Sequence, residues 1–232
     1  MFRMIAAALV TLLLPTSVAA AELSKLEARW LRGVMPVLEY AQQARLPLDV
    51  VVQPQATPGL PPLAMAFIDG RCKLVLSMRD NPSAQATLNR IDAELLDATL
   101  EMMAAHELGH CNRHAAGHWQ QLPPGLPEDA AHRVPAGLRP ERHADYLRMQ
   151  ATRREEAYAD LAGLAWVRQR HASVFSRLRD WLVSERSRDL IPGSHHDTLA
   201  WLRLAADGHA LQMQRSPFAA DALWAQGFVV GE

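Results

Sequence analysis

Two histidines and a glutamate stand close together in the segment His106-Glu107-Leu108-Gly109-His110. On a helix, residues four positions apart lie one turn apart on the same face, so both imidazoles can bind one metal ion. Glu107 follows the first histidine directly, and its carboxylate can accept a proton from a metal-bound water. The pattern is typical of zinc hydrolases. Such a short motif also arises by chance in a chain with ten histidines, so the rest of the sequence must supply the remaining parts of a site.

A hydrolytic zinc site needs three protein ligands and one open position for water or substrate. A metzincin would place a histidine six residues after the second motif histidine, but Ala116 occupies that position. The gluzincin pattern instead has a glutamate on a second helix, four residues before an aspartate. Glu156 and Asp160 have this spacing and lie one turn apart on one helix face. The two motifs therefore indicate one site.

With both motifs in this order, the chain resembles the gluzincin zinc metalloendopeptidases of the family that includes the CAAX prenyl endopeptidase, the heat-shock protease HtpX and their soluble periplasmic relatives. The specific matches are residues 106–110 and 156–163. Weaker matches are the turn Asp69-Gly70 and the segment 195–198. The resemblance implies an α+β, zincin-like, mainly helical domain with a small antiparallel β-sheet edge lining the active-site cleft.

The resemblance also implies a role for each site residue. One Zn²⁺ per chain would be bound by His106, His110 and Glu156. Glu107 would be the general base, and Asp160 would hydrogen-bond a ligand histidine and fix its orientation. His195 would stabilise the oxyanion, but His196 stands where the family has proline, which leaves the choice between these histidines open. Arg203 is the candidate for an arginine of the family, at a different spacing.

The function implied by the resemblance is that of an exported zinc metalloendopeptidase. It would hydrolyse peptide bonds of extended or unfolded protein substrates with a zinc-activated water, in envelope protein quality control by analogy with its relatives. The substrate would pair with the exposed hairpin edge through main-chain hydrogen bonds. The alternative is a non-catalytic zinc-binding or metal-buffering periplasmic protein that keeps the protease fold. The intact Glu107 favours the enzyme, because a binding protein does not need a general base.

Length and composition limit the other possibilities. With 232 residues, 49% of them apolar, the chain can bury one core, and we predict a cleaved signal peptide over residues 1–21 and a single domain over residues 22–232. The signal has Arg3 and an apolar run that is about half the roughly twenty residues of a membrane span; an uncleaved anchor is the alternative. We therefore expect a periplasmic or secreted protein without a transmembrane segment after signal cleavage. A net charge of -1 gives no electrostatic case for nucleic-acid binding.

Hydrophobic spacing predicts the elements that must position these residues. In chain order we expect a helix over 22–45, a strand over 48–52, a hairpin over 64–76, helical structure from 81 to 117 that carries the first motif, helical structure from 141 to 188 that carries the second, and a last amphipathic helix from 198. The Asp-Gly pair in the hairpin favours a type I′ turn, which needs positive φ at both positions. The apolar C-terminal tail is expected to dock on the body.

Two features keep alternatives open. Cys72 and Cys111 can pair in an oxidising compartment or stay two buried thiols; a place for Cys111 beside the metal is disfavoured, because successive helix residues differ by about 100°. Residues 122–140, with five prolines and two glycines, form either a lid over the cleft or a plain solvent loop. His132 and His143, in or beside this loop, are alternative caps for the metal.

Overall fold

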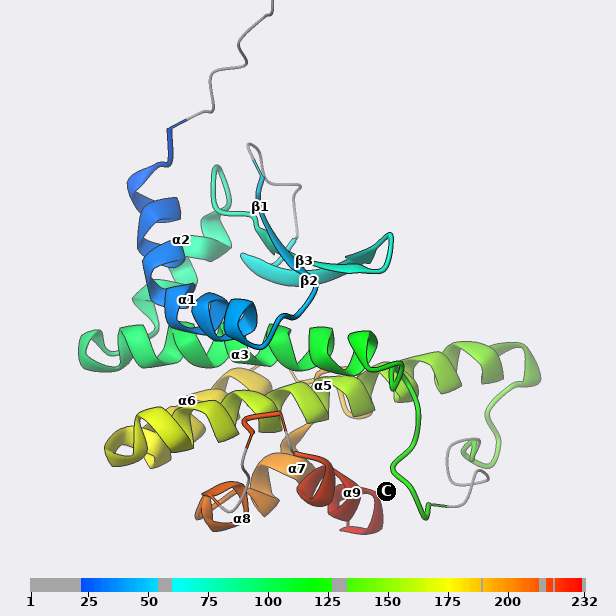
Figure 1. Ribbon diagram of the computed structural model, residues 1–232. Coiled ribbons are helices and arrows are strands. Elements are labelled where there is room, and N and C mark those ends of the chain that lie inside the picture. The colour runs from blue at the N-terminus through cyan, green and yellow to red at the C-terminus, as the bar shows by residue number, and fades with distance from the viewer. Residues whose placement is uncertain are drawn as a thin grey trace, which may run out of the picture.

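The chain folds into layers of helices with one small sheet on one side of the central helix, as the computed structural model in Figure 1 shows. The described residues are 22–53, 60–126, 133–188, 190–212, 216–218 and 220–230. The helices are α1 (Lys25–Gln43), α2 (Pro82–Asn89), α3 (Leu96–Ala115), α5 (His143–Arg170), α6 (Phe175–Ser187), α7 (Leu199–Leu204), α8 (His209–Gln212) and α9 (Asp221–Val230). The predicted mainly helical α+β class is confirmed. The predicted signal peptide lies outside the described residues.

Helix α3 runs through the middle of the molecule, and the other layers pack on its two sides. Helix α1 and the sheet lie on one side, and helix α5 lies on the other. Helices α7, α8 and α9 pack against α5 on its far side from α3. Among the helices of the described residues, none is long and apolar enough to cross a membrane.

The sheet has three strands, β1 (Leu48–Val52), β2 (Leu63–Ile68) and β3 (Arg71–Leu76), in the order β1-β3-β2. Strands β2 and β3 form the predicted hairpin, and Asp69 and Gly70 have φ angles of 52° and 72°, as a type I′ turn requires. The prediction of an antiparallel sheet is wrong for β1, because β3 inserts between β1 and β2 and pairs with β1 in parallel. Strand β2 is left as an edge of the sheet.

A disulfide joins Cys72 on β3 to Cys111 on α3, with a Cα–Cα distance of 5.7 Å. Both cysteines are buried. The structure therefore decides between the alternatives: the two thiols are neither free nor placed at the cluster of the motif side chains. The bond ties the sheet directly to the helix that carries both motif histidines.

Helices α3 and α5 approach each other closely because small residues lie where they meet. A Cβ atom on Gly163 would lie 2.9 Å from the Met102 carbonyl oxygen, and one on Gly109 would lie 3.0 Å from the Ala162 Cβ. Both glycines belong to the two sequence motifs. The close packing brings the glutamate of the second motif opposite the histidines of the first.

Three predicted helical stretches are each divided by a turn. The stretch from 141 to 188 consists of α5 and α6, separated by a short 3-10 turn, Ala172–Val174. The stretch from Asn81 consists of α2, whose cap is the Asn81 side chain accepting from the Ser83 amide at 3.0 Å, and α3, which follows a short 3-10 turn, Ala93–Leu95. The predicted last helix consists of α7 and α8, separated by a turn in which Gly208 has a φ of 66°. The tail docks through α9, where Phe228 packs on the rings of two buried tryptophans.

Candidate metal centre

Three possible ligand side chains from α3 and α5 converge where the two helices meet. The Nε2 atoms of His106 and His110 lie 3.2 Å apart. The Glu156 carboxylate faces both, with Oε2 at 3.4 Å from His106 Nε2 and Oε1 at 3.5 Å from His110 Nε2. Within the part of the chain that the structure describes, these residues are the one group with the spacing to hold a metal ion. The two sequence motifs thus predicted which residues come together.

Asp160 hydrogen-bonds the ring nitrogen of His106 that faces away from the other ligand atoms. Its Oδ1 atom accepts from His106 Nδ1 at 2.9 Å, which leaves Nε2 of that ring to face the other ligand atoms. Thr198 donates its hydroxyl to Asp160 Oδ2 at 2.6 Å, so the weakly matching segment near the last helix also reaches the site. Such a partner fixes both the tautomer and the orientation of a ligand histidine. Asp160 therefore lies where the sequence predicted it.

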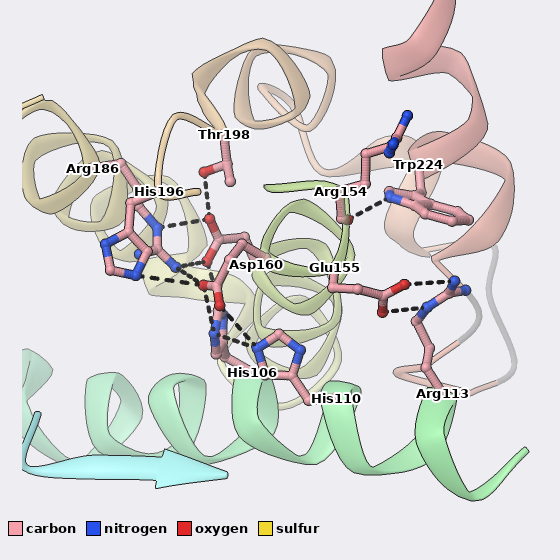
Figure 2. A network of polar contacts seen from close by, with 11 residues as sticks. His106, His110, Arg113, Arg154, Glu155, Asp160, Arg186, His196, Thr198 and Trp224 are labelled. Carbon is pink, nitrogen blue, oxygen red and sulfur yellow. Dashed lines mark hydrogen bonds and ion pairs between the residues drawn. The ribbon is translucent and has the colours of Figure 1, made fainter. Parts of the chain in front are cut away.

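Arg186, near the end of α6, is a part of the site that sequence reasoning missed. Its guanidinium donates to both Asp160 oxygens at 2.8 and 2.6 Å and lies 3.4 Å from the Glu156 carboxylate (Figure 2). Arg203, which the sequence offered as the arginine of the site, is exposed instead. Arg186 stands in the charged run 185–188, which has no distinctive spacing, so no local signal marks it.

The electrostatics of the cluster favour a cation. Burial alone lowers the pKa of His106, but hydrogen bonds and charge from Asp160 and Glu156 outweigh it and raise the pKa to about 10. Burial alone raises the pKa of Asp160, but the Arg186 charge and the His106 hydrogen bond hold it well below the usual range. The buried Asp160 carboxylate and the partly buried Glu156 carboxylate thus lie against the imidazole nitrogens.

Glu107 lines the cavity beside the ligand cluster, one position along α3 from the first ligand. Burial raises its pKa, and the nearby His106 and His110 offset this only in part. A carboxylate with a raised pKa keeps a proton more readily after accepting one, which suits a general base that later donates the proton again.

The cluster opens into a cavity of about 580 Å³ between the sheet and helix α6. The edge strand β2 lines one side of it from Leu63 to Phe67, and α3 forms the floor with both motif histidines. Trp119, which follows α3, lines the cavity on the side of His110, with 5.7 Å between the two ring centroids. An edge strand therefore runs along the space beside the ligand atoms.

Of the two neighbouring histidines before α7, His196 lines the cavity and His195 does not. His196 Nε2 lies 3.8 Å from Glu156 Oε2, and the His195 ring packs against His196 at 4.0 Å between centroids. Burial and the Arg186 charge lower the pKa of His196 to about 4, so this ring is neutral at pH 7. The sequence predicted His195 for this position and left His196 as the alternative; of the two rings, the structure places that of His196 on the cavity wall.

The proline-rich segment 122–140 contributes none of its described residues to the cavity lining. Its residues 127–132, which include His132, lie outside the described residues. His143 hydrogen-bonds the Leu138 carbonyl at 2.9 Å and is not among the residues that line the cavity. The described parts of this segment therefore give no support to a lid or a histidine cap.

Comparison of the chain with protein-family models, with curated proteins and with solved structures found no match. The assignment of a function therefore rests on the residues of the cluster and their geometry.

Proposed function

We propose that this protein is an exported zinc metalloendopeptidase of the gluzincin type that hydrolyses peptide bonds of extended or unfolded protein substrates. The observation that carries the proposal is the convergence of His106, His110 and Glu156, with Glu107 beside them on the cavity wall. The disulfide supports export, because such bonds persist in oxidising compartments.

The donor atoms and their spacing support zinc as the metal. Imidazole nitrogen and carboxylate oxygen bind zinc at about 2.0–2.2 Å, and tetrahedral geometry then separates the ligand atoms by roughly 3.3–3.6 Å. Here the two imidazole nitrogens lie 3.2 Å apart, and each lies 3.4 or 3.5 Å from a different oxygen of Glu156. With one ligand atom taken from each residue, the three atoms lie within 4.8 Å of one another. A set of three protein ligands is also typical of catalytic zinc sites, which keep a fourth position for water or substrate.

The surrounding side chains would each have one task in the hydrolysis. Zinc, when bound, would supply a Lewis acid that polarises the peptide carbonyl and acidifies water. Glu107 would accept the proton of the attacking water and pass it to the leaving amine. The neutral His196 would donate a hydrogen bond to the developing oxyanion. Asp160 would keep His106 oriented, and the β2 edge would bind the substrate main chain.

The test combines zinc content with cleavage of casein, for the mature protein and its Glu107→Gln variant. We expect one zinc per chain in both, and a loss of activity of about 10²- to 10⁴-fold in the variant, as for removal of a general base. Glu39→Gln, at an exposed position on α1, is the matched control and should keep full activity.

Two other outcomes would contradict the proposal. Zinc in both proteins with cleavage by neither would favour the non-catalytic zinc-binding protein. Absence of zinc from the wild type after purification with sufficient metal would remove the site itself.

A further inference from the structure

The cavity extends from the ligand cluster to an apolar end. Met102 and Met103 lie on α3 about one turn before His106, and Trp181 and Leu182 lie on α6 about one turn before Arg186. Together with Leu63, the first residue of β2, these side chains line the cavity and are called here the apolar end. The opposite part of the cavity, near Trp119, lies toward the C-terminus of α3. The two parts flank the ligand atoms, so the apolar end adjoins the position of a reacting bond.

Two opposite charges border the apolar end and pair with each other, and Glu185 also accepts from Arg188, whose side chain is 46% exposed, at 2.6 Å. Arg90, at the end of α2, donates to both carboxylate oxygens of Glu185 on α6, at 3.1 and 2.9 Å. The Arg90 and Glu185 side chains are only 31% and 19% exposed, and both line the cavity. Arg90 also approaches the buried Thr87 hydroxyl at 3.4 Å. A charged ligand group that entered here would lose its water and find each protein charge already paired.

We propose that the apolar end selects a large uncharged apolar side chain next to the scissile bond, and that Arg90 and Glu185 are specificity-determining residues. This inference rests on the proposed hydrolase function. Methionine side chains are flexible and polarisable, so Met102 and Met103 would accept several shapes, including leucine, methionine and phenylalanine. The paired charges would reject aspartate, glutamate and lysine at the same position.

The test uses wild-type protein loaded with zinc and a set of peptides that differ at one position, with the cleavage sites read by mass spectrometry. At one position beside the cleaved bond, leucine, methionine and phenylalanine should exceed aspartate and lysine by about 10-fold or more in kcat/KM. Met103→Trp should fill the apolar end and move the preference to alanine or glycine.

Glu185→Gln is a second variant that leaves the apolar contacts unchanged. Because it removes the carboxylate that pairs with both Arg90 and Arg188, we expect aspartate and glutamate to gain about 10-fold relative to lysine at the selected position. Arg177→Gln is the matched control on the same helix, since Arg177 pairs with Asp92 at 3.0 Å but does not line the cavity. Its cleavage pattern should equal that of the wild type.

Binding separates a failure of this inference from a failure of the hydrolase proposal. Labelled peptides are titrated by fluorescence anisotropy into Glu107→Gln, alone and combined with Glu185→Gln. A wild type that cleaves none of the peptides would contradict the hydrolase proposal. If the leucine peptide then still binds about 10-fold more tightly than the aspartate peptide, and Glu185→Gln reduces that difference, the apolar end remains a binding site for an apolar side chain with Arg90 and Glu185 setting its selectivity. Equal binding of the two peptides, binding of neither, or a cleavage pattern unchanged by both Met103→Trp and Glu185→Gln would overturn the inference.

Discussion

Asp160 shows how one buried residue can orient a candidate metal ligand from outside the ligand set. It hydrogen-bonds His106 and is itself held by Arg186 and Thr198, so its carboxylate has little freedom to turn. Changes to such partners of ligand histidines typically reduce metal affinity 10- to 100-fold. The orientation of the ligand thus depends on a network that reaches from α5 to α6 and to the cap of α7.

We therefore expect Asp160→Asn to weaken zinc binding by about 10- to 100-fold, because the amide cannot accept from both His106 and the Arg186 fork as the carboxylate does. Competition with a chromogenic chelator measures the affinity. Asp180→Asn, at an exposed position on α6, serves as the control. An unchanged affinity in Asp160→Asn would show that Asp160 has no part in holding the ligand.

A second buried ion pair lies on the other side of α5, as Figure 2 shows. Arg113 donates to Glu155 at 2.7 and 3.0 Å, and both side chains are almost fully buried. Arg113 also donates to the carbonyls of His118 and Gln121, which flank the cavity-lining Trp119. Removal of one partner leaves a buried charge without compensation.

For Arg113→Met we expect a loss of about 3–5 kcal/mol in the free energy of unfolding, as for other broken buried pairs. Urea denaturation measures it, with the exposed Arg148→Met as control. The double variant Arg113→Met with Glu155→Leu should recover much of the loss, because it removes the uncompensated charge. A loss below about 1 kcal/mol in the single variant would contradict the inferred role of the pair.

At the scale of single residues, the site residues that follow a helical spacing could be predicted from the sequence, and those without such a spacing could not. His106, His110, Glu156 and Asp160 were predictable because helical periodicity places residues four apart on one face. Arg186 and Arg113 were not, because each pairs with a residue on another helix. Such pairing is set by how the helices pack, and a single sequence carries no local sign of it.

At the scale of elements, the packing of α3 on α5 decides whether the ligand atoms meet. Gly163 has no space for a Cβ, since that atom would lie 2.9 Å from the Met102 carbonyl oxygen. In a helix interior alanine is favoured over glycine by about 1 kcal/mol. Here the overlap involves backbone, so the helices must move apart if alanine is introduced.

Gly163→Ala is therefore expected to destabilise the fold by about 1–3 kcal/mol, as overpacking does, despite its higher helix propensity. It should also weaken zinc binding, because Glu156 lies on the same helix and must reach both histidines. Thermal unfolding and chelator competition measure the two effects. A gain in stability together with unchanged zinc affinity would show that the helix contact adapts without cost to the site.

The disulfide is the other link between elements that bears on the site. It closes a separation of 39 residues between Cys72 and Cys111, for which the loop-closure estimate is about 4 kcal/mol. We expect Cys72→Ala with Cys111→Ala to lose stability of that order in urea denaturation. Added dithiothreitol should lower the stability of the wild type and leave the double variant unchanged. Equal stability of the two proteins without reductant would contradict a stabilising role.

The sheet also combines a pairing that a local turn predicts with a pairing between strands that are not neighbours in the sequence. The hairpin was predictable because the Asp69-Gly70 turn is a local signal between two apolar runs. The parallel pairing of β1 with β3 was not, because it depends on which strand inserts between the others. The same holds for the turn that separates α2 from α3, since the apolar spacing continues across it.

At the scale of the whole molecule, the site joins layers that the chain builds separately. Helix α3 supplies two of the proposed ligands, α5 supplies the third, and α6 supplies Arg186. The carboxylates of Glu107, Glu156 and Asp160 face the Arg186 guanidinium and the His106 ring, whose raised pKa of about 10 keeps it protonated in the metal-free site. A divalent cation would take the place of that proton and bridge the two central helices.

Metal removal should therefore destabilise the whole fold and not only stop catalysis. A ligand present at about 1,000 times its Kd stabilises the folded state by about 4 kcal/mol, and a chelator removes that contribution. We expect EDTA to lower the Tm of the wild type and zinc to restore it. His110→Ala, which lacks one ligand, should have a Tm that changes much less with either addition. If EDTA shifts both proteins equally or neither, metal binding at this cluster does not hold α3 and α5 together.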